Sequence, residues 1–364
     1  MSKLLKLSVP LKLSILDQSP IPDGATSGDA LRNTIDLARH ADRLGYSRYW
    51  IAEHHGTPGL ASASPEVMIG PVASATRHIR VGTGGVMLPH YSPLKVAETF
   101  SMLSSLYPDR IDLGIGRAPG TSARVAFALQ RDRRQPAPDD FPDQMAELFH
   151  YFHHQPGQTD PAAPDPRANP FRQAPNLRYH SPELGLLGSS PQSAVWAAEW
   201  GLPYIFADFI NPKGAPMAAI YREHFVPSSS LAKPRTSVCV WALCAETSEE
   251  ALKLSASARM MLLHLFRGRL IRVPSVDRAL AYLENEGVPV NQVPEGRRII
   301  TGDPATVKEA IQDAAVEYGA DEVFLVNIVY DHAARLQSYE LIAEAFELHR
   351  PPAEAVLSSG GSES

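Results

Sequence analysis

The residues best able to do chemistry in this chain come directly after short apolar runs. Such runs are typical of buried strands, and polar or glycine-rich residues where parallel strands end often form a site. The segments concerned are Asp17-Gln18, Glu53-His54-His55-Gly56, Gly82-Thr83-Gly84-Gly85, Gly114 to Gly120, Leu187 to Pro191 and Ala207-Asp208. Together they offer carboxylates, imidazoles, hydroxyl groups and a guanidinium.

His54 is the strongest candidate for acid-base chemistry. Glu53, His54 and His55 could be metal ligands, could include a catalytic histidine, or could form a polar rim. Neighbouring residues of a strand point to opposite faces, so both histidines reach one metal only if the strand ends between them. No H-x-H or H-E-x-x-H pattern accompanies them. We therefore favour a catalytic His54, titrating near neutral pH, over a metal site or a structural role.

The segment from Gly114 to Gly120 could bind a phosphate group. It lacks the G-x-G-x-x-G spacing of a dinucleotide fingerprint, and Pro119 would break the helix that should follow. It holds Arg117 on a glycine-permitted turn, where a guanidinium can bind phosphate in a bidentate way. A salt bridge to a local carboxylate such as Asp112 is the alternative.

A cluster of serines is the second candidate for phosphate binding. Ser189, Ser190 and Ser193 stand where a strand runs directly into a helix, so hydroxyl groups, free N–H groups and the positive helix end meet there. Ordinary helix capping would explain one serine but not the cluster. Gly188 and its neighbours do not form a G-x-S-x-G elbow, which disfavours a serine hydrolase.

Glycines gather at the end of the run at 79–86. Gly82, Gly84 and Gly85 pack no side chain, and glycine in a strand often marks close approach of a ligand or an unusual peptide bond. A bulge or turn before Pro89 is the alternative.

The elements that would position these residues alternate along the chain. We expect strands at 13–16, 46–52, 79–86, 110–115, 183–187, 202–207, 235–243 and 322–328. Amphipathic helical patterns separate them, which predicts right-handed parallel β/α units. Because no linker divides the eight strands, we predict one (β/α)8 TIM barrel over residues 1–350. Residues 130–182 and 267–300 are expected to be loop insertions, and 351–364 a flexible tail.

Composition narrows the class of protein. The chain has 364 residues and a net charge of -6, with 44% hydrophobic and 20% charged residues. No basic block could neutralise a phosphate backbone, so we expect no nucleic-acid partner. The two cysteines, Cys239 and Cys244, favour neither a disulfide framework nor a thiolate metal site. Without 18 consecutive apolar residues or a signal-peptide h-region, we expect a cytoplasmic protein with no membrane span.

From Leu13 to about His349 the chain resembles the bacterial luciferase-like flavin monooxygenase family. The matching segments, in the family's order, are Ala52 to His55, Val81 to Pro89, Leu113 to Thr121, Leu186 to Ser193, Thr301 to Pro304 and Tyr318 to Phe324. The resemblance implies a (β/α)8 barrel with insertions, usually dimeric. It also implies FMN, or in some branches the deazaflavin F420, at the C-terminal mouth.

By position, the resemblance assigns roles to these residues. Arg117 and the serine cluster resemble the contacts that bind the FMN phosphate. Gly84-Gly85 resembles a pair of residues joined by a cis peptide beneath the flavin. His54 resembles the histidine beside the flavin ring. Further cofactor contacts are expected at Glu53, Thr83, Met87, Leu187 and Gly188, and substrate contacts at Gln18, His55 and Asp208. The chain differs from luciferase at several of these positions. It has glycines at 84 and 85 where luciferase has alanines, Ser189 where luciferase has a glutamate, and Gly116 where luciferase has a cysteine. Light emission is therefore not implied.

The implied activity is a monooxygenase that takes reduced FMN from a separate flavin reductase. It would add dioxygen at the flavin C4a position and oxygenate a mainly apolar organic substrate through the C4a-peroxide. Alternatives are an F420-dependent hydride-transferring oxidoreductase, a non-catalytic flavin-binding protein and a metal-dependent barrel hydrolase.

We further expect the two insertions to roof the pocket and keep water out, with apolar residues such as Phe141, Met145 and Leu270. Amphipathic helices that simply pack on the barrel would show the same spacing. Three arginines of the first insertion, Arg131, Arg133 and Arg134, could bind one carboxylate of a substrate.

Overall fold

The computed structural model describes residues 10–117, 122–130, 132–135, 139–153, 180–292 and 298–348. The predicted tail at 351–364, and residues 154–179 of the first predicted insertion, lie outside these ranges.

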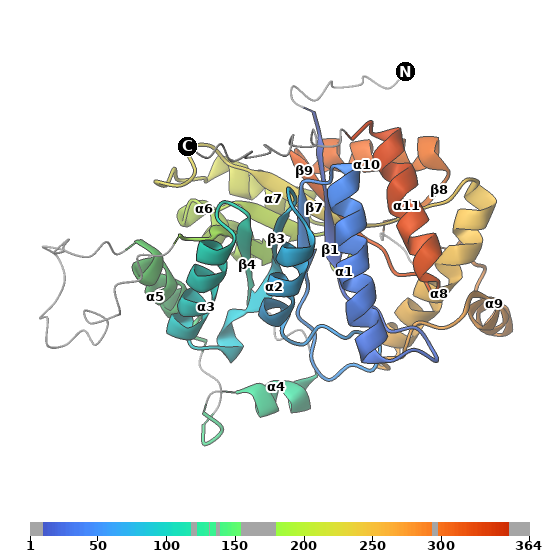
Figure 1. The fold of residues 1–364 in the computed structure, drawn as a ribbon, viewed down its shortest axis with the longest axis horizontal. Coiled ribbons are helices and arrows are strands. Elements are labelled where there is room, and N and C mark those ends of the chain that lie inside the picture. The colour runs from blue at the N-terminus through green and yellow to red at the C-terminus, as the bar shows by residue number, and fades with distance from the viewer. Residues whose placement is uncertain are drawn as a thin grey trace, which may run out of the picture.

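Eight parallel strands close into a barrel (Figure 1). They are β1 (Lys12–Asp17), β2 (Arg48–Ile51), β3 (Arg80–Met87), β4 (Ile111–Gly116), β5 (Glu183–Gly188), β6 (Tyr204–Ala207), β7 (Thr236–Cys244) and β9 (Glu322–Val326). Neighbours in the sequence pair from β1 to β7, and β9 pairs with both β7 and β1, which closes the ring. The predicted (β/α)8 barrel is therefore confirmed.

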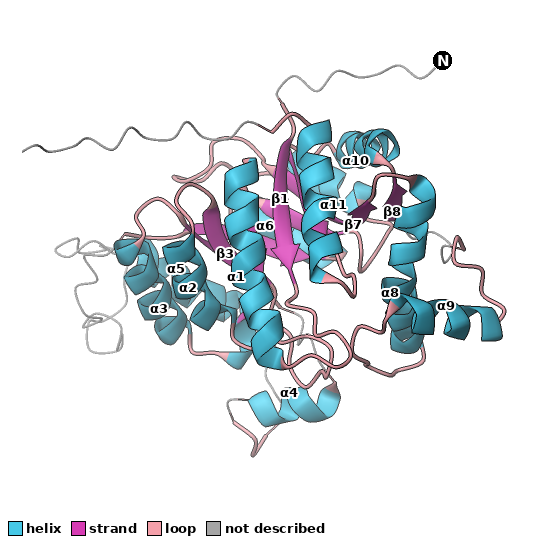
Figure 2. Cartoon of the chain, turned by 45° about the vertical axis from the view of Figure 1, so that its right-hand side comes forward, coloured by secondary structure: helices cyan, strands magenta, loops and turns pink. Residues whose placement is uncertain are grey.

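Helices cover the outside of the barrel, and Figure 2 shows β1 between α1 and α11. Their bounds are α1 (Ser27–Leu44), α2 (Pro65–Ala75), α3 (Pro93–Leu106), α4 (Ala123–Leu129), α5 (Phe141–His153), α6 (Pro191–Glu199), α7 (Ala215–Glu223), α8 (Ser248–Phe266), α9 (Val276–Asn285), α10 (Pro304–Tyr318) and α11 (His332–Ala345). A short 3-10 turn, Leu88–His90, follows β3. No helix in the described part of the chain combines the length and apolar character needed to cross a membrane.

Helix α5 lies within residues 130–182, which the sequence predicts to be a loop insertion. It lies beside α3, and Phe141, Met145 and Leu148 on one of its faces are almost completely buried in the core. Residues spaced by three or four along a helix share a face, so this face packs into the barrel wall. Phe141, at the start of the helix, also lines a cavity at the mouth of the barrel.

The second predicted insertion also contains regular structure. Helix α9 packs on α8 through Ala279, Leu283 and Met260. Strand β8 (Ile299–Gly302), which the sequence reading missed, pairs only with the second half of β7, from Trp241 to Cys244. It is a ninth strand outside the ring, and it pairs with the part of β7 that continues beyond the pairing with β9.

Trp50 fills the inside of the barrel. Its Nε1 donates a hydrogen bond to Asp112 Oδ2 over 2.8 Å, and its ring lies 4.6 Å from that of Phe324. A Cβ atom at Gly82 would lie 2.9 Å from the indole Nε1, and one at Gly114 would lie 3.0 Å from the indole ring. At both positions the strand needs glycine to leave room for this side chain and for neighbouring backbone.

A buried ion-pair network stands at the N-terminal ends of the strands. The Arg48 guanidinium lies 2.7 Å from Asp112, 3.1 Å from Glu183 and 3.2 Å from Glu322. A buried charge is costly unless it is paired. Here carboxylates from three strands pair with the Arg48 guanidinium.

Candidate active site

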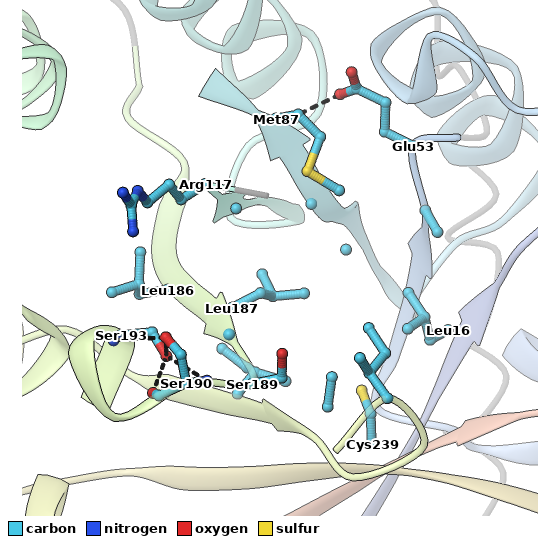
Figure 3. Close-up of a pocket in the computed structure, with 18 of the residues that line it drawn as sticks. Leu16, Glu53, Met87, Arg117, Leu186, Leu187, Ser189, Ser190, Ser193 and Cys239 are labelled. Atoms are coloured by element: carbon cyan, nitrogen blue, oxygen red, sulfur yellow. Dashed lines mark hydrogen bonds between the residues drawn. The ribbon is translucent and has the colours of Figure 1, made fainter. Parts of the chain in front are cut away.

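A cavity of about 470 Å³, which we call the first cavity, opens at the carboxyl ends of the strands (Figure 3). This volume is typical of cofactor and small-molecule sites. The predicted site residues that line it are Gln18, Glu53, His54, Gly84, Gly85, Met87, Arg117, Leu187, Gly188, Ser189, Ser190 and Ser193. They come from the ends of β1 to β5 and from the start of α6, so the barrel collects segments far apart in the sequence.

Glu53 joins the ends of β2 and β3. Its side chain is completely buried, and Oε2 accepts a hydrogen bond from the Met87 N–H over 2.9 Å (Figure 3). Its Oε1 lies 2.6 Å from His55 Nε2. Because both oxygens are engaged, Glu53 fixes the backbone and His55 and does not offer a free carboxylate to the cavity.

His54 is the residue of the first cavity best suited to proton chemistry. Its backbone N–H donates to the Ser62 carbonyl over 2.9 Å, while its Nδ1 is buried with no hydrogen-bond partner in the described residues. Desolvation, and to a smaller extent the neighbouring His55, lowers the pKa of His54 to about 4. The expected titration near neutral pH is therefore wrong, because burial disfavours the charged imidazolium. His54 is a neutral imidazole at pH 7.

Arg117 marks the polar end of the first cavity. Its Nη2 lies 2.7 Å from Asp139 Oδ2, and its guanidinium carbon lies 5.4 Å from the ring centre of Trp196. The predicted alternative, a salt bridge to a local carboxylate such as Asp112, is met by Asp139 and not by Asp112, which pairs with Arg48 and Arg80. Within the described part of the chain only Nη2 of Arg117 makes a hydrogen bond, so its other N–H groups are available beside the cavity.

Helix α6 points its N-terminus toward the same end. Ser190 is the N-cap residue and forms a capping box with Ser193, whose Oγ also donates to the Ser190 carbonyl over 2.7 Å. Ser193 Oγ further lies 3.0 Å from the Tyr204 hydroxyl. Figure 3 shows Arg117 and this pair of serines on one side of the cavity, with Leu16 and Glu53 on the other. A guanidinium and a helix N-terminus on one side are suited to an anion.

The peptide bond between Gly84 and Gly85 is cis, as predicted. Both residues line the first cavity.

Comparison with known proteins decides the family. The sequence profile of the luciferase-like monooxygenases matches residues 11–322. The chain belongs to this family. Members are monooxygenases, so the chain is an enzyme of that class.

Two similar proteins align with nearly the whole of this chain. The N-acetyl-S-alkylcysteine monooxygenase of Bacillus subtilis is 37% identical over 337 residues, which are 92% of this chain and 98% of that protein. The crystal structure of apo-MsnO8 is 39% identical, covers 93% of this chain and 98% of its own, and superposes with a TM-score of 0.82.

More distant structures share the fold of the family. The oxygenating constituent of 3,6-diketocamphane monooxygenase from Pseudomonas putida, in complex with FMN, is 20% identical, with a TM-score of 0.69 over 92% of this chain and 97% of its own. An F420-dependent secondary alcohol dehydrogenase is 16% identical, with a TM-score of 0.61 over 93% and 98%.

Two predicted contacts of this luciferase-like monooxygenase do not line either of its two large cavities. Thr83 is completely buried, and its Oγ1 donates to the Gly114 carbonyl over 2.9 Å. Asp208 is also buried, and it accepts a hydrogen bond from the Tyr318 hydroxyl over 2.7 Å. Side chains alternate along a strand, so Gly84 and Ala207 take the places facing the cavity, and Thr83 and Asp208 point away.

A second cavity of about 510 Å³ adjoins the first in this luciferase-like monooxygenase. Gln18, His54, Phe209 and Ile210 line both. His55, predicted to contact substrate, lines the second cavity and not the first.

Several cavity residues were missed by the sequence reading. They include Leu16, Trp196, Ile205, Phe209 and Ile210. Trp196 lies one helical turn after Ser193, so its spacing could have indicated it. The apolar residues carry no such signal, because core residues look the same in sequence. No group of three His, Cys, Asp or Glu side chains that could hold a metal comes together in the described ranges.

Proposed function

We propose that this enzyme is an FMN-dependent monooxygenase that uses reduced FMN and dioxygen to oxygenate a mainly apolar organic substrate. The observation that carries the proposal is the division of the first cavity. One side holds Arg117 and the N-terminus of α6, and the rest is lined mainly by apolar side chains and glycines. FMN has the same division, since a phosphate at one end is joined to a flat ring system at the other.

The charge of the first cavity suits a single phosphate. Arg117 and Glu53 are its only fully charged lining side chains in the described residues, and both Glu53 oxygens are already engaged. FMN brings one phosphate monoester to the Arg117 end. F420 brings a phosphodiester and further carboxylates, which one arginine cannot balance, so the charge count favours FMN.

The remaining walls suit a flat ring. Gly84 and Gly85 present backbone without side chains, and Leu16 and Leu187 add apolar surface (Figure 3). We assign the ring contacts to these residues and to Met87, and the phosphate contacts to Arg117 and to the segment from Gly188 to Ser193.

When bound, reduced FMN supplies two electrons, so that one oxygen atom of dioxygen enters the substrate and the other leaves as water. Neutral His54 can accept a proton from a reacting group or donate one hydrogen bond to it. The apolar lining of both cavities keeps the reacting oxygen away from bulk water.

The partners in this proposal are dioxygen, a flavin reductase that supplies reduced FMN, and a second copy of the chain. The name of the Bacillus subtilis relative, a monooxygenase of N-acetyl-S-alkylcysteines, supports oxygen transfer to an organic molecule.

The test supplies the enzyme with chemically reduced FMN, labelled dioxygen and a panel of apolar and aromatic compounds. We expect one labelled oxygen atom in a product, detected by mass spectrometry. Substrate-dependent reduction of F420 without oxygen uptake would replace this proposal with the hydride-transfer alternative. Tight FMN binding without any turnover would favour a flavin-binding protein.

A further inference from the structure

The second cavity is large enough for a substrate and adjoins the first. The two share a wall formed by Gln18, His54, Phe209 and Ile210. A molecule in the second cavity therefore contacts the same imidazole that faces the first. This arrangement places a substrate beside a cofactor with His54 between them.

Most of the second cavity is apolar. Its lining comes largely from the end of α8 and the residues that follow, including Leu265 and Leu270, whose side chains are about half exposed, at 52% and 46%. Exposed leucines at a cavity mouth favour an apolar ligand, because covering them removes apolar surface from water.

One charged side chain interrupts this apolar lining. Among the described residues, Arg269 is the only lysine or arginine that lines the second cavity, and no aspartate or glutamate among them lines it. Its side chain makes no ion pair or hydrogen bond with the described residues. Arg267, two residues earlier, contrasts with it, because Arg267 donates to Glu286 over 2.6 Å and to the Tyr282 hydroxyl over 2.8 Å.

The other arginines considered for a carboxylate are less suitable. Arg134 is paired with Asp132, and Arg133 donates to the Ala128 carbonyl. Arg131 lies outside the described residues. Neither Arg133 nor Arg134 lines either cavity.

We propose that the substrate is an apolar molecule that carries one carboxylate. The carboxylate binds Arg269, the apolar body fills the second cavity, and the atom to be oxygenated lies at His54. This inference rests on the proposed function for the identity of the reaction, but the binding of the acid can be tested alone.

The experiment measures binding by calorimetry, using the full chain with and without oxidised FMN. The probes are 4-phenylbutanoate and its uncharged isostere 4-phenylbutanamide, with decanoate as a second acid. We expect the wild-type enzyme to prefer the acid over the amide by about tenfold, as a charge-assisted bidentate contact would give. The variant Arg269→Gln should lose this preference and keep its affinity for the amide within about twofold.

Arg267→Gln is the matched control, since it removes an arginine from the same turn that does not line the cavity. It should leave both affinities unchanged. Equal binding of acid and amide by the wild-type enzyme would overturn the inference, as would an unchanged preference in Arg269→Gln. No measurable binding of either acid would overturn it as well.

Tryptophan fluorescence locates the ligand, because Trp241 lines the second cavity and not the first. Acid binding should change the emission of the wild-type enzyme, and the change should be largely lost in Trp241→Phe while affinity is retained. If acids bind as expected but take up no labelled oxygen with reduced FMN, the proposed function fails and the cavity assignment stands.

Discussion

The Arg117 guanidinium donates a hydrogen bond to Asp139 across 2.7 Å at the edge of the first cavity. Both side chains are substantially exposed, at 46% and 70%, so water weakens their attraction. The pairing orients the guanidinium but also places a negative charge next to the side proposed for a phosphate.

Removing Arg117 should weaken FMN binding selectively. We expect Arg117→Ala to raise the Kd for FMN about tenfold or more, since a charge-assisted contact to phosphate is lost. Riboflavin, which has no phosphate, should bind almost as before. Quenching of flavin fluorescence measures both. Equal losses for the two flavins would place Arg117 away from the phosphate.

Removing the competing carboxylate should have the opposite effect. Asp139→Asn frees Arg117 and removes a like charge beside the phosphate, so FMN should bind up to about fivefold more tightly, the scale of one exposed ion pair. The gain should shrink at high salt, which screens exposed charges. Weaker FMN binding in this variant would contradict the prediction.

His54 should control turnover and not flavin binding. We expect His54→Ala to lower oxygenation by roughly 10²–10⁴, the range for a lost acid-base group, with FMN affinity nearly unchanged. Because the pKa of His54 is about 4, the wild-type rate should show no step from this residue near pH 6.5. An oxygenation rate that is unchanged in His54→Ala would indicate a structural role for His54.

The same lowered pKa predicts how stability depends on pH. An unfolded histidine binds a proton below about pH 6.5, whereas folded His54 resists protonation until about pH 4. The unfolded state therefore binds more protons in this window, and stability should fall as pH drops from about 6.5 to 4, by about 3 kcal/mol. Urea unfolding should show a smaller decrease in His54→Phe. An identical decrease in stability in His54→Phe would show that other groups cause the pH dependence.

Glycine at the barrel interior should be irreplaceable. A Cβ atom at Gly114 would lie 2.2 Å from the Thr83 carbonyl oxygen, so Gly114→Ala should destabilise the enzyme by about 1–3 kcal/mol or prevent folding. Gly70 is the matched control, because a Cβ there meets nothing within 4 Å and lies in α2. Gly70→Ala should be neutral or stabilising by up to about 1 kcal/mol. Thermal unfolding compares the two variants.

Exposed apolar residues on α2 and α3 should lie in a homodimer interface. Val67 on α2 and Met102 and Leu106 on α3 are 67%, 56% and 68% exposed, and the two helices are neighbours (Figure 1). Large apolar side chains exposed on adjacent helices commonly mark an interface. Leu106→Glu should shift the mass in light scattering from dimer to monomer, whereas Val316→Glu on α10 should not. A monomeric wild-type enzyme would exclude the homodimer.

Much of the barrel and of its mouth could be predicted from the sequence. Parallel strands bring their carboxyl ends to one side, so any polar segment after an apolar run is a candidate, and Glu53, Arg117 and Ser190 were found this way. The direction of a side chain is harder to predict, because it depends on where the strand stops. Thr83 and Asp208 are each one residue away from a position that faces the cavity.

Burial and loop paths could not be read from spacing. The pKa of His54 depends on desolvation by residues from several strands, and Arg269 reaches the second cavity only through the path of the chain after α8. Helix α5 shows the same limit, since its apolar spacing suited a lid and the barrel wall equally well.

Trp50 and the Arg48 ion pairs fill the barrel interior on the N-terminal side of the first cavity, so among the described residues the way into this cavity lies at the C-terminal mouth. Reactants and product must then use the same exit in turn. If FMN binds as proposed, product that is still bound would block the entry of the next reduced FMN. At high product concentration, turnover should then be limited by product release through this entrance and not by the chemistry at His54.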